Sequence, residues 1–245
     1  MNRTLLGLWA HPDDEAYLSA GLMREFVRNG DRVVVVTATP GQHGTADPIS
    51  WPPDRLAARR RRELAESLGE LGVTEHYVLD YEDGHCEGAD GSDGFAAYIV
   101  AVDPDVIVTF GPDGITGHPD HRAVHHWATT AWATTGARAD LLYATFTPDF
   151  HRRWGAVNER IGLFADQPIP PSTPYDQLAD FLVLDDAGRV AKLAALRAHR
   201  TQTEQLIDLV GVDTYRDWWC VEAFRAADRD VIAVPPREAL EGVFA

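Results

Sequence analysis

Short apolar runs alternate with amphipathic segments along the first two thirds of the chain. Residues 5–9 and 32–38 are almost wholly apolar, and the second run is mostly β-branched, which is typical of strands buried on both faces of a sheet. Residues 15–28 instead have the spacing of an amphipathic helix, and Asn29-Gly30 is a usual stop signal. The pattern therefore predicts that strands and helices alternate.

This alternation continues far enough to predict a fold class. We expect strands at residues 5–9, 32–38, 75–79, 105–110 and 141–146, with helices at 15–28, 54–71, 95–102 and 119–135. Strands linked through helices form a Rossmann-like, mostly parallel sheet that is flanked by helices, an α/β fold. Ligands bind such sheets beyond the carboxyl ends of the strands.

The last third of the chain is less regular. Residues 188–206 have a helical pattern, residues 218–224 alternate enough for a late strand, and the proline-rich residues 167–174 are expected to form a loop. Nothing in the sequence marks a domain boundary, so residues 1–245 are expected to form one domain. Its core is assigned to residues 1–147 and a C-terminal elaboration to residues 148–245.

Charge and cysteine content exclude several classes of protein. The chain has 22 basic and 38 acidic residues, a formal net charge of −16, which argues against binding to nucleic acid or an anionic membrane. No apolar window approaches the length of a membrane span and the first residues lack a secretory signature, so a cytoplasmic location is expected. Cys86 and Cys220 are the only cysteines, which predicts unpaired thiols and no thiolate zinc site.

Two motifs that combine histidine with aspartate follow apolar runs. Residues 10–15 read Ala-His-Pro-Asp-Asp-Glu, and residues 117–121 read Gly-His-Pro-Asp-His. Each lies where a strand gives way to a helix, so both are expected at the ligand-binding edge of the sheet. Catalytic zinc commonly takes three protein ligands from His, Asp or Glu and keeps one position open. Together the motifs predict a mononuclear metal-dependent amide hydrolase.

The first motif supplies two candidate ligands and a candidate base. His11 and Asp14 are close enough in a turn to reach one ion. Adjacent side chains in a turn tend to diverge, so Asp13 need not compete with Asp14 for the metal. We therefore assign Asp14 to the metal and Asp13 as the general base.

The second motif supplies the remaining candidates. His118 and His121 are three residues apart and project to the same side of a helix. If His121 is the third ligand, His118 is free to stabilise the oxyanion and to protonate the leaving amine. Asp120 is suited to hold one imidazole in its tautomer and to raise its basicity.

Other interpretations of the same residues stay open at this point. Aspartates at a helix start also serve as caps, and histidines are often core or surface residues. His121 and His125 have the spacing of zinc-protease ligands, but Arg122 and Ala123 follow His121 where those enzymes have Glu, so the base is absent. We expect His125 and His126 at or near the surface. The joint occurrence of both motifs favours the catalytic interpretation.

The paired motifs resemble those of the PIG-L/LmbE-like family of zinc-dependent de-N-acetylases. The family's Ala-His-Pro-Asp-Asp-Glu corresponds to residues 10–15, and its Gly-rich turn followed by His-Pro-Asp-His corresponds to residues 114–121. The resemblance implies zinc held by His11, Asp14 and His121, with Asp13 as the base and His118 as the acid or oxyanion partner. It adds the reaction, which is hydrolysis of an N-acetyl amide.

Substrate contacts are expected from several further positions. Arg60 interrupts the apolar face of the helix at 54–71 near the ligand edge, and Glu63, three residues on, could pair with it. A similar Arg-x-x-Glu occurs in family members, which supports a role in holding substrate hydroxyls, although a solvated arginine face is the alternative. Thr116 stands where some sugar–inositol deacetylases have tyrosine, and residues 39–42 read Thr-Pro-Gly-Gln where members often have Thr-Arg-Gly-Glu.

Residues in the loops and in the last third have two interpretations each. Trp51 either stacks on a sugar ring or anchors its own loop, and His199 either reaches the pocket or is an exposed polar residue. His43, His85 and Asp113 lie in loops that leave the same edge of the sheet.

The sequence therefore predicts a cytoplasmic hydrolase that removes an N-acetyl or related acyl group from an amino sugar or sugar conjugate. The expected cofactor is Zn²⁺, and another divalent metal such as Fe²⁺ suits the same ligands. The expected partner is a small N-acetylated sugar or conjugate, and a homo-oligomer is compatible with the sequence. The alternatives are an amidase for larger thiol or glycopeptide conjugates and a non-catalytic, metal-containing sugar-binding protein. A nucleotide-binding module is disfavoured because no Gly-x-Gly-x-x-Gly follows the first strand.

Overall fold

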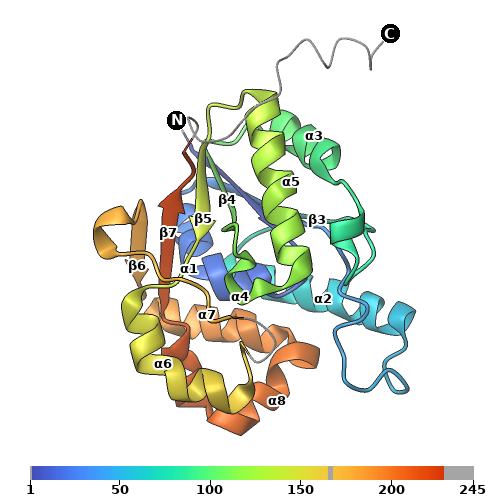
Figure 1. The fold of residues 1–245 in the computed structure, drawn as a ribbon, viewed down its shortest axis with the longest axis vertical. Coiled ribbons are helices and arrows are strands. Elements are labelled where there is room, and N and C mark those ends of the chain that lie inside the picture. Colours follow the sequence, from blue (N-terminus) through green and yellow to red (C-terminus); the bar gives the residue numbers. More distant parts are fainter. Residues whose placement is uncertain (1, 165–167, 229–245) are drawn as a thin grey trace.

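A single seven-stranded sheet organises the chain (Figure 1). The computed structural model describes residues 2–164 and 168–228, so part of the predicted C-terminal elaboration lies outside the described residues. The strand order is β3-β2-β1-β4-β5-β7-β6. The strands are β1 (Thr4–Trp9), β2 (Arg32–Thr37), β3 (Glu75–Val78), β4 (Val106–Phe110), β5 (Asp140–Ala144), β6 (Asp180–Val183) and β7 (Val221–Ala226).

The first five strands are parallel, as the alternation of strands and helices predicts. β7 pairs antiparallel with β5, and β6 pairs antiparallel with β7 at the edge of the sheet. The valines at 33–36 are buried, because both faces of β2 are covered by helices. The predicted mostly parallel α/β class is confirmed.

Helices cover both faces of the sheet. α3 (Ser92–Val102) packs against α5 (Pro119–Thr135), while α1 (Asp14–Arg28) and α2 (Pro53–Leu71) pack against α7 (Asp186–Ala198) (Figure 1). The other helices are α4 (Gly114–Gly117), α6 (Pro148–Ile161), α8 (Arg200–Val210) and α9 (Val212–Trp218), with short 3₁₀ turns at Cys86–Gly88 and Tyr175–Gln177. Within the described residues, none of the helices is long and apolar enough to cross a membrane.

The last third differs from its prediction in three ways. The single helix predicted at 188–206 is two helices, α7 and α8, which are separated at His199. Trp218 ends α9 rather than starting a strand, and β7 begins at Val221. Neither α6 nor β6 was predicted, because β6 is short and mostly exposed and so has no clear apolar period.

The order of the strands creates the place for a ligand. The chain moves outward from β1 to β2 and β3, and then returns to place β4 on the other side of β1. Such a reversal opens a crevice beyond the carboxyl ends of the two central strands. The first motif follows β1 and the second follows β4, so both meet at this crevice.

Candidate metal centre and substrate pocket

Three side chains from the two motifs converge beyond β1 and β4. Nδ1 of His11 lies 3.2 Å from Nε2 of His121. Asp14 spans both, with one oxygen 3.6 Å from Nδ1 of His11 and the other 3.3 Å from Nε2 of His121. A tetrahedral zinc with bonds of about 2.1 Å holds neighbouring donor atoms roughly 3.4 Å apart. The separations therefore match those of ligands that share one ion.

Hydrogen bonds at the far side of each ring set the direction of its lone pair. Nε2 of His11 lies 3.1 Å from a carboxylate oxygen of Asp120 and 3.1 Å from one of Asp83. Nδ1 of His121 lies 3.0 Å from the carbonyl of Gly114. Carboxylates and carbonyls only accept, so these two nitrogens carry the protons and the facing nitrogens present lone pairs.

Two lone pairs 3.2 Å apart repel unless a proton or a metal ion lies between them, so a divalent metal fits in place of the proton that the two rings would otherwise share. The nitrogens of His11, His118 and His121 also lie within 4.8 Å of one another. Although burial lowers it, the surrounding carboxylates of Asp120, Asp83 and Asp14 raise the pKa of His11 to about 10. The centre thus attracts positive charge strongly.

A tight turn holds the carbonyl that orients His121. Gly114 has φ +67°, and a Cβ there would lie 3.0 Å from Cβ of His121. Ile115 also has a positive φ of 58°, which is uncommon for a branched residue. The turn is stabilised by Asp113, whose side chain accepts the N–H of Ile115. The glycine-rich segment therefore acts on the ligand that follows it.

Asp13 lines the pocket beside the candidate metal ligands. Its φ of 128° is unusual for a residue other than glycine, and its N–H donates to Glu15 at 2.9 Å. Its carboxylate lies 3.3 Å from the guanidinium of Arg60. Burial raises the pKa of Asp13 to about 6, while the charge of Arg60 opposes this shift. The structure thus separates Asp13 from Asp14, as expected for a base beside a ligand.

His118 also faces the pocket, from the first turn of α5. Its Nδ1 accepts the N–H of Asp120 at 3.1 Å, so in the neutral ring Nε2 carries the proton. Burial, together with the charge of His11, lowers the pKa of His118. A neutral imidazole with a free N–H can stabilise an oxyanion by a hydrogen bond, whereas a general acid would have to be charged. The neutral ring of His118 therefore suits the first role better.

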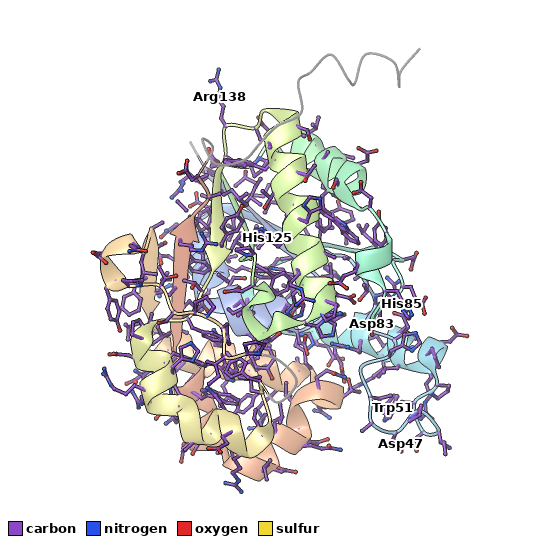
Figure 2. All side chains as sticks on the ribbon, in the orientation of Figure 1. Asp47, Trp51, Asp83, His85, His125 and Arg138 are labelled. Carbon is purple, nitrogen blue, oxygen red and sulfur yellow. The ribbon has the colours of Figure 1, made fainter. Side chains whose placement is uncertain are left out.

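Asp120 and Asp83 lie behind His11. The two oxygens of Asp120 also accept the N–H groups of Gly84 at 2.7 Å and Cys86 at 3.0 Å. Asp120 is therefore tied to the loop between β3 and α3, and the imidazole that it orients is that of His11. Asp83, which the sequence analysis did not single out, comes from the same loop (Figure 2). The one signal in the sequence that could have pointed to Asp83 is the acidic character of this loop, which leaves the ligand-binding edge of the sheet.

Arg60 is buried and faces the pocket, as predicted, but its predicted partner is wrong. It donates to the backbone carbonyls of Pro12 at 2.6 Å and Gly41 at 3.0 Å. Gly41 is needed here, because its φ is +67° and a Cβ would lie 2.3 Å from the guanidinium. Glu63 instead pairs with Arg59 at 2.9 Å, because the guanidinium of Arg60 is held by these two carbonyls.

Glu63 also accepts hydrogen bonds from the backbone and hydroxyl of Thr201. It therefore fastens α8 to α2 and does not line the pocket among the described residues. Thr116 does line the pocket, and its hydroxyl lies 3.3 Å from Nδ1 of His121.

The remaining candidates divide between the pocket and other roles. His43 lines the pocket, whereas Trp51 stacks with Arg55 at 4.9 Å and lines a neighbouring hollow. His125 is partly buried on α5 (Figure 2), and its ring bonds the carbonyl of Phe110 at 2.9 Å. His126 is exposed. His125 therefore takes no part in the metal centre.

His199 is fully buried, which overturns the exposed alternative. Its Nε2 lies 2.8 Å from Glu15, the residue that accepts the N–H of Asp13. His199 does not line the pocket among the described residues, so it reaches the site only through Glu15.

The pocket itself has a volume of about 530 Å³, within the range of small-molecule sites. The three candidate ligands, Asp13 and His118 all line it. Side chains that the sequence analysis missed complete its walls, and they come from both halves of the chain: Tyr17, Leu18, Asp83, Phe146, Ile161, Leu163, Leu206, Trp218 and Trp219.

Comparisons with known proteins identify relatives of this chain. A family model described as PIG-L, GlcNAc-PI de-N-acetylase, matches residues 6–132. A 1D-myo-inositol 2-acetamido-2-deoxy-alpha-D-glucopyranoside deacetylase of Nocardioides sp. is 31% identical over 281 residues, covering 92% of this chain and 92% of its own length.

Two solved structures are similar in fold. The N,N'-diacetylchitobiose deacetylase of Pyrococcus horikoshii has a TM-score of 0.66 and 23% identity, covering 97% of this chain and 89% of that chain. The zinc inhibited form of a teicoplanin deacetylase has a TM-score of 0.62 and 17% identity, covering 92% of this chain and 99% of that chain.

Proposed function

The chain belongs to the PIG-L family of de-N-acetylases, as its two motifs predict, and from this premise we propose that it is a metal-dependent hydrolase that removes an N-acetyl group from an amino sugar or sugar conjugate. The observation that carries the proposal is the meeting of His11, Asp14 and His121 beside Asp13. A binding protein needs the ligands alone, whereas an amide hydrolase also needs a base within reach of the bound carbonyl.

The proposed ligands are His11, Asp14 and His121. The set of two imidazoles and one carboxylate suits Zn²⁺, and Fe²⁺ is accepted by the same ligand types. When bound, the ion polarises the amide carbonyl and activates a water molecule. Asp120 and Asp83 hold the ring of His11 with its Nδ1 toward Asp14 and His121, so that Nδ1 would be free to bind the ion.

Asp13 is proposed as the base. It takes a proton from the attacking water, whose hydroxide part bonds to the carbonyl carbon. The pKa of about 6 that burial gives Asp13 makes it a better proton acceptor than an exposed aspartate while leaving it ionised at neutral pH. Cleavage of the carbon–nitrogen bond then requires a proton on the leaving nitrogen, and Asp13 holds that proton.

His118 is proposed as the oxyanion partner. Its outward Nε2–H is fixed by the backbone N–H that Nδ1 accepts, so it can donate to the tetrahedral oxygen without changing its charge. Of the two roles that the sequence allowed, this tautomer supports oxyanion stabilisation rather than general acid catalysis. The products are acetate and the free amine.

Polar groups of the pocket are proposed to receive the sugar. The hydroxyl of Thr116 and the side chains of His43 and Gln202 line the pocket. The donors of Arg60 are largely taken by Pro12, Gly41 and Asp13, so its proposed role moves from holding substrate to setting the charge of Asp13.

The test is release of acetate and amine from N-acetylated amino sugars, measured on metal-loaded protein. Asp13→Asn should lower kcat at least about a hundredfold, and His118→Gln by a similar factor. Turnover of large conjugates alone would favour the amidase alternative. Tight metal and sugar binding without any turnover would instead show a sugar-binding protein.

A further inference from the structure

The polarity of the pocket changes along the edge of the sheet. Loops that follow β2 and β3 contribute polar side chains, including His43 and Asp83, on one side. The segments that follow β5 and precede β7 contribute mostly apolar ones on the other. Among the described residues, their one polar side chain in the pocket is Gln202, which donates to the backbone of Gly44 and so lies at the polar side. We call the second side the apolar wall, and it consists of Phe146, Ile161, Leu163, Leu206, Trp218 and Trp219.

The order of the strands explains this division. β2 and β3 lie on one side of the central pair β1 and β4, and β5 and β7 lie on the other. Figure 1 shows α6 below the sheet, on the far side of α8 from the loop between β2 and α2. α8 itself reaches that loop near its first turn, where Gln202 donates to the carbonyl of Gly44 at 3.1 Å. The metal ligands follow β1 and β4, so the reacting carbonyl must lie between the polar side and the apolar wall.

An amide whose carbonyl lies at the centre extends in two directions, the acyl group one way and the amine the other. Burying sugar hydroxyls against an apolar surface leaves them without hydrogen bonds, which is costly. The polar side offers hydrogen-bond partners for hydroxyls, such as His43 and Gln202. In the apolar wall the only polar groups are the indole N–H groups of Trp218 and Trp219, which are buried. The amino sugar is therefore matched by the polar side and the acyl group by the apolar wall.

The apolar wall is built in advance. The ring centroid of Trp219 lies 4.6 Å from that of Trp218 and 4.7 Å from that of Tyr17. Phe146 stacks on Phe150 at 4.1 Å with an angle of 11° between the planes. Packed rings of this kind cannot collapse into the pocket, so the space in front of them is available to a ligand.

We propose that the apolar wall is an acyl subsite, and that the preferred substrates are amino sugars whose N-acyl group is a saturated chain longer than acetyl. This inference rests on the proposed function. A single methyl group covers little of a wall made by six large side chains, whereas a chain of several methylenes removes much more apolar surface from water. It also gives the last third of the described chain a role in specificity, because five of the six residues come from it.

The experiment compares N-acetyl-, N-butyryl-, N-hexanoyl- and N-octanoyl-glucosamine on the metal-loaded enzyme by amine release. Each buried methylene can strengthen binding by up to about fourfold. We expect kcat/KM to rise at least about tenfold from N-acetyl to N-hexanoyl. Octyl N-acetyl-glucosaminide carries its chain on the sugar instead and should show no comparable gain.

Leu206 and Leu209 form a matched pair on α8. Leu206 lines the pocket, whereas Leu209 is 44% exposed. Leu206→Gln should lower the ratio of hexanoyl to acetyl kcat/KM about fivefold or more, because it places an amide in the acyl path. Leu209→Gln makes the same change outside the pocket and should leave this ratio as it is.

The possible outcomes separate the inference from the proposed function. A fall in kcat/KM with chain length, an unchanged ratio in Leu206→Gln, or a gain only from the octyl glycoside would each overturn the acyl subsite, although N-acetyl hydrolysis would still stand. Absence of amine release from every compound would overturn the proposed function itself.

Discussion

Glu15 and His199, 184 residues apart in the sequence, form a fully buried pair with 2.8 Å between Oε1 and Nε2. The hydroxyl of Ser67 donates to the same carboxylate, and the N–H of Asp13 donates to its other oxygen. Although burial opposes both shifts, each partner favours the charged form of the other, so the pKa of Glu15 is lowered and that of His199 is raised. The pair therefore links the break between α7 and α8 to the candidate base.

Removing one member of this pair should be costly. His199→Ala leaves the charge of Glu15 buried without its partner, and we expect the free energy of unfolding to fall by about 3 kcal/mol or more. Because Glu15 also holds the strained backbone of Asp13, kcat should fall by about tenfold or more in the folded variant. Denaturant unfolding and kcat measure the two effects. His126→Ala removes an exposed histidine as the control, and equal effects of the two changes would refute the link.

Arg60 should control the acidic limb of the pH–rate profile. The guanidinium, 3.3 Å from Asp13, lowers the pKa of that carboxylate against the effect of burial. Arg60→Met removes the cation, so the pKa of Asp13 rises. As the pH is lowered, activity should therefore begin to fall at a higher pH than in the unaltered enzyme. We expect the limb of kcat/KM to move upward by about one pH unit. The exposed Arg62→Met is the control, and an unmoved limb in Arg60→Met would disprove this role.

Asp120 should matter more for metal affinity than its distance from the substrate suggests. Asp120→Asn places an amide where the carboxylate accepts from His11, Gly84 and Cys86, so at least one donor faces another donor. Such changes behind a ligand typically weaken metal binding about 10- to 100-fold. Competition with a chelator of known affinity measures the change. Asp93→Asn, an exposed position, should bind metal like the unaltered chain, and no loss in Asp120→Asn would contradict the assignment.

His125 should make the fold less stable in acid. Burial lowers its pKa, and Arg225 adds to that effect, whereas its hydrogen bond to Phe110 and the charge of Asp113 oppose it. Below its ordinary pKa of about 6.5, the ring of His125 accepts a proton in the unfolded chain but resists it in the folded chain. The stability that the neutral ring contributes is therefore fully present above that pH and is lost as the pH falls toward the lower pKa of the folded state.

His125→Asn keeps a donor near Phe110 but cannot take up a proton in this range. Chemical denaturation between pH 7.5 and 5 should therefore show a gentler loss of stability in the variant than in the unaltered chain, with a single proton limiting the difference in slope to about 1.4 kcal/mol per pH unit. Identical slopes would mean that His125 titrates alike in both states.

Much of the fold, and the meeting of the candidate ligands, could be predicted because the decisive signals are local. The apolar run of β2 and the stop after α1 need no knowledge of distant contacts. His11 and Asp14 lie on one turn, and the alternation of strands and helices brings that turn to the same edge as His121. Short segments with strong patterns therefore predicted both the elements and the residues that meet.

The failures have the opposite cause, since they depend on contacts between distant segments. The segment around His199 consists of good helix formers, so its sequence does not reveal that the chain breaks there to bury an imidazole against Glu15. The predicted partner of Arg60, Glu63, was wrong for a related reason. Spacing along α2 does not reveal that the backbone carbonyl of Pro12 lies within reach of the guanidinium. Likewise, the apolar wall is assembled from residues in or next to α6, α8 and α9, and no single stretch of sequence contains it.

The most direct test of the account is the metal content of the purified chain and of three single variants, His11→Ala, Asp14→Ala and His121→Ala. Elemental mass spectrometry after exhaustive dialysis should find one divalent ion per chain in the unaltered protein and in His126→Ala. Each of the three variants should retain well under a tenth of that amount while unfolding cooperatively. A full equivalent of metal in any of the three would contradict the proposed centre.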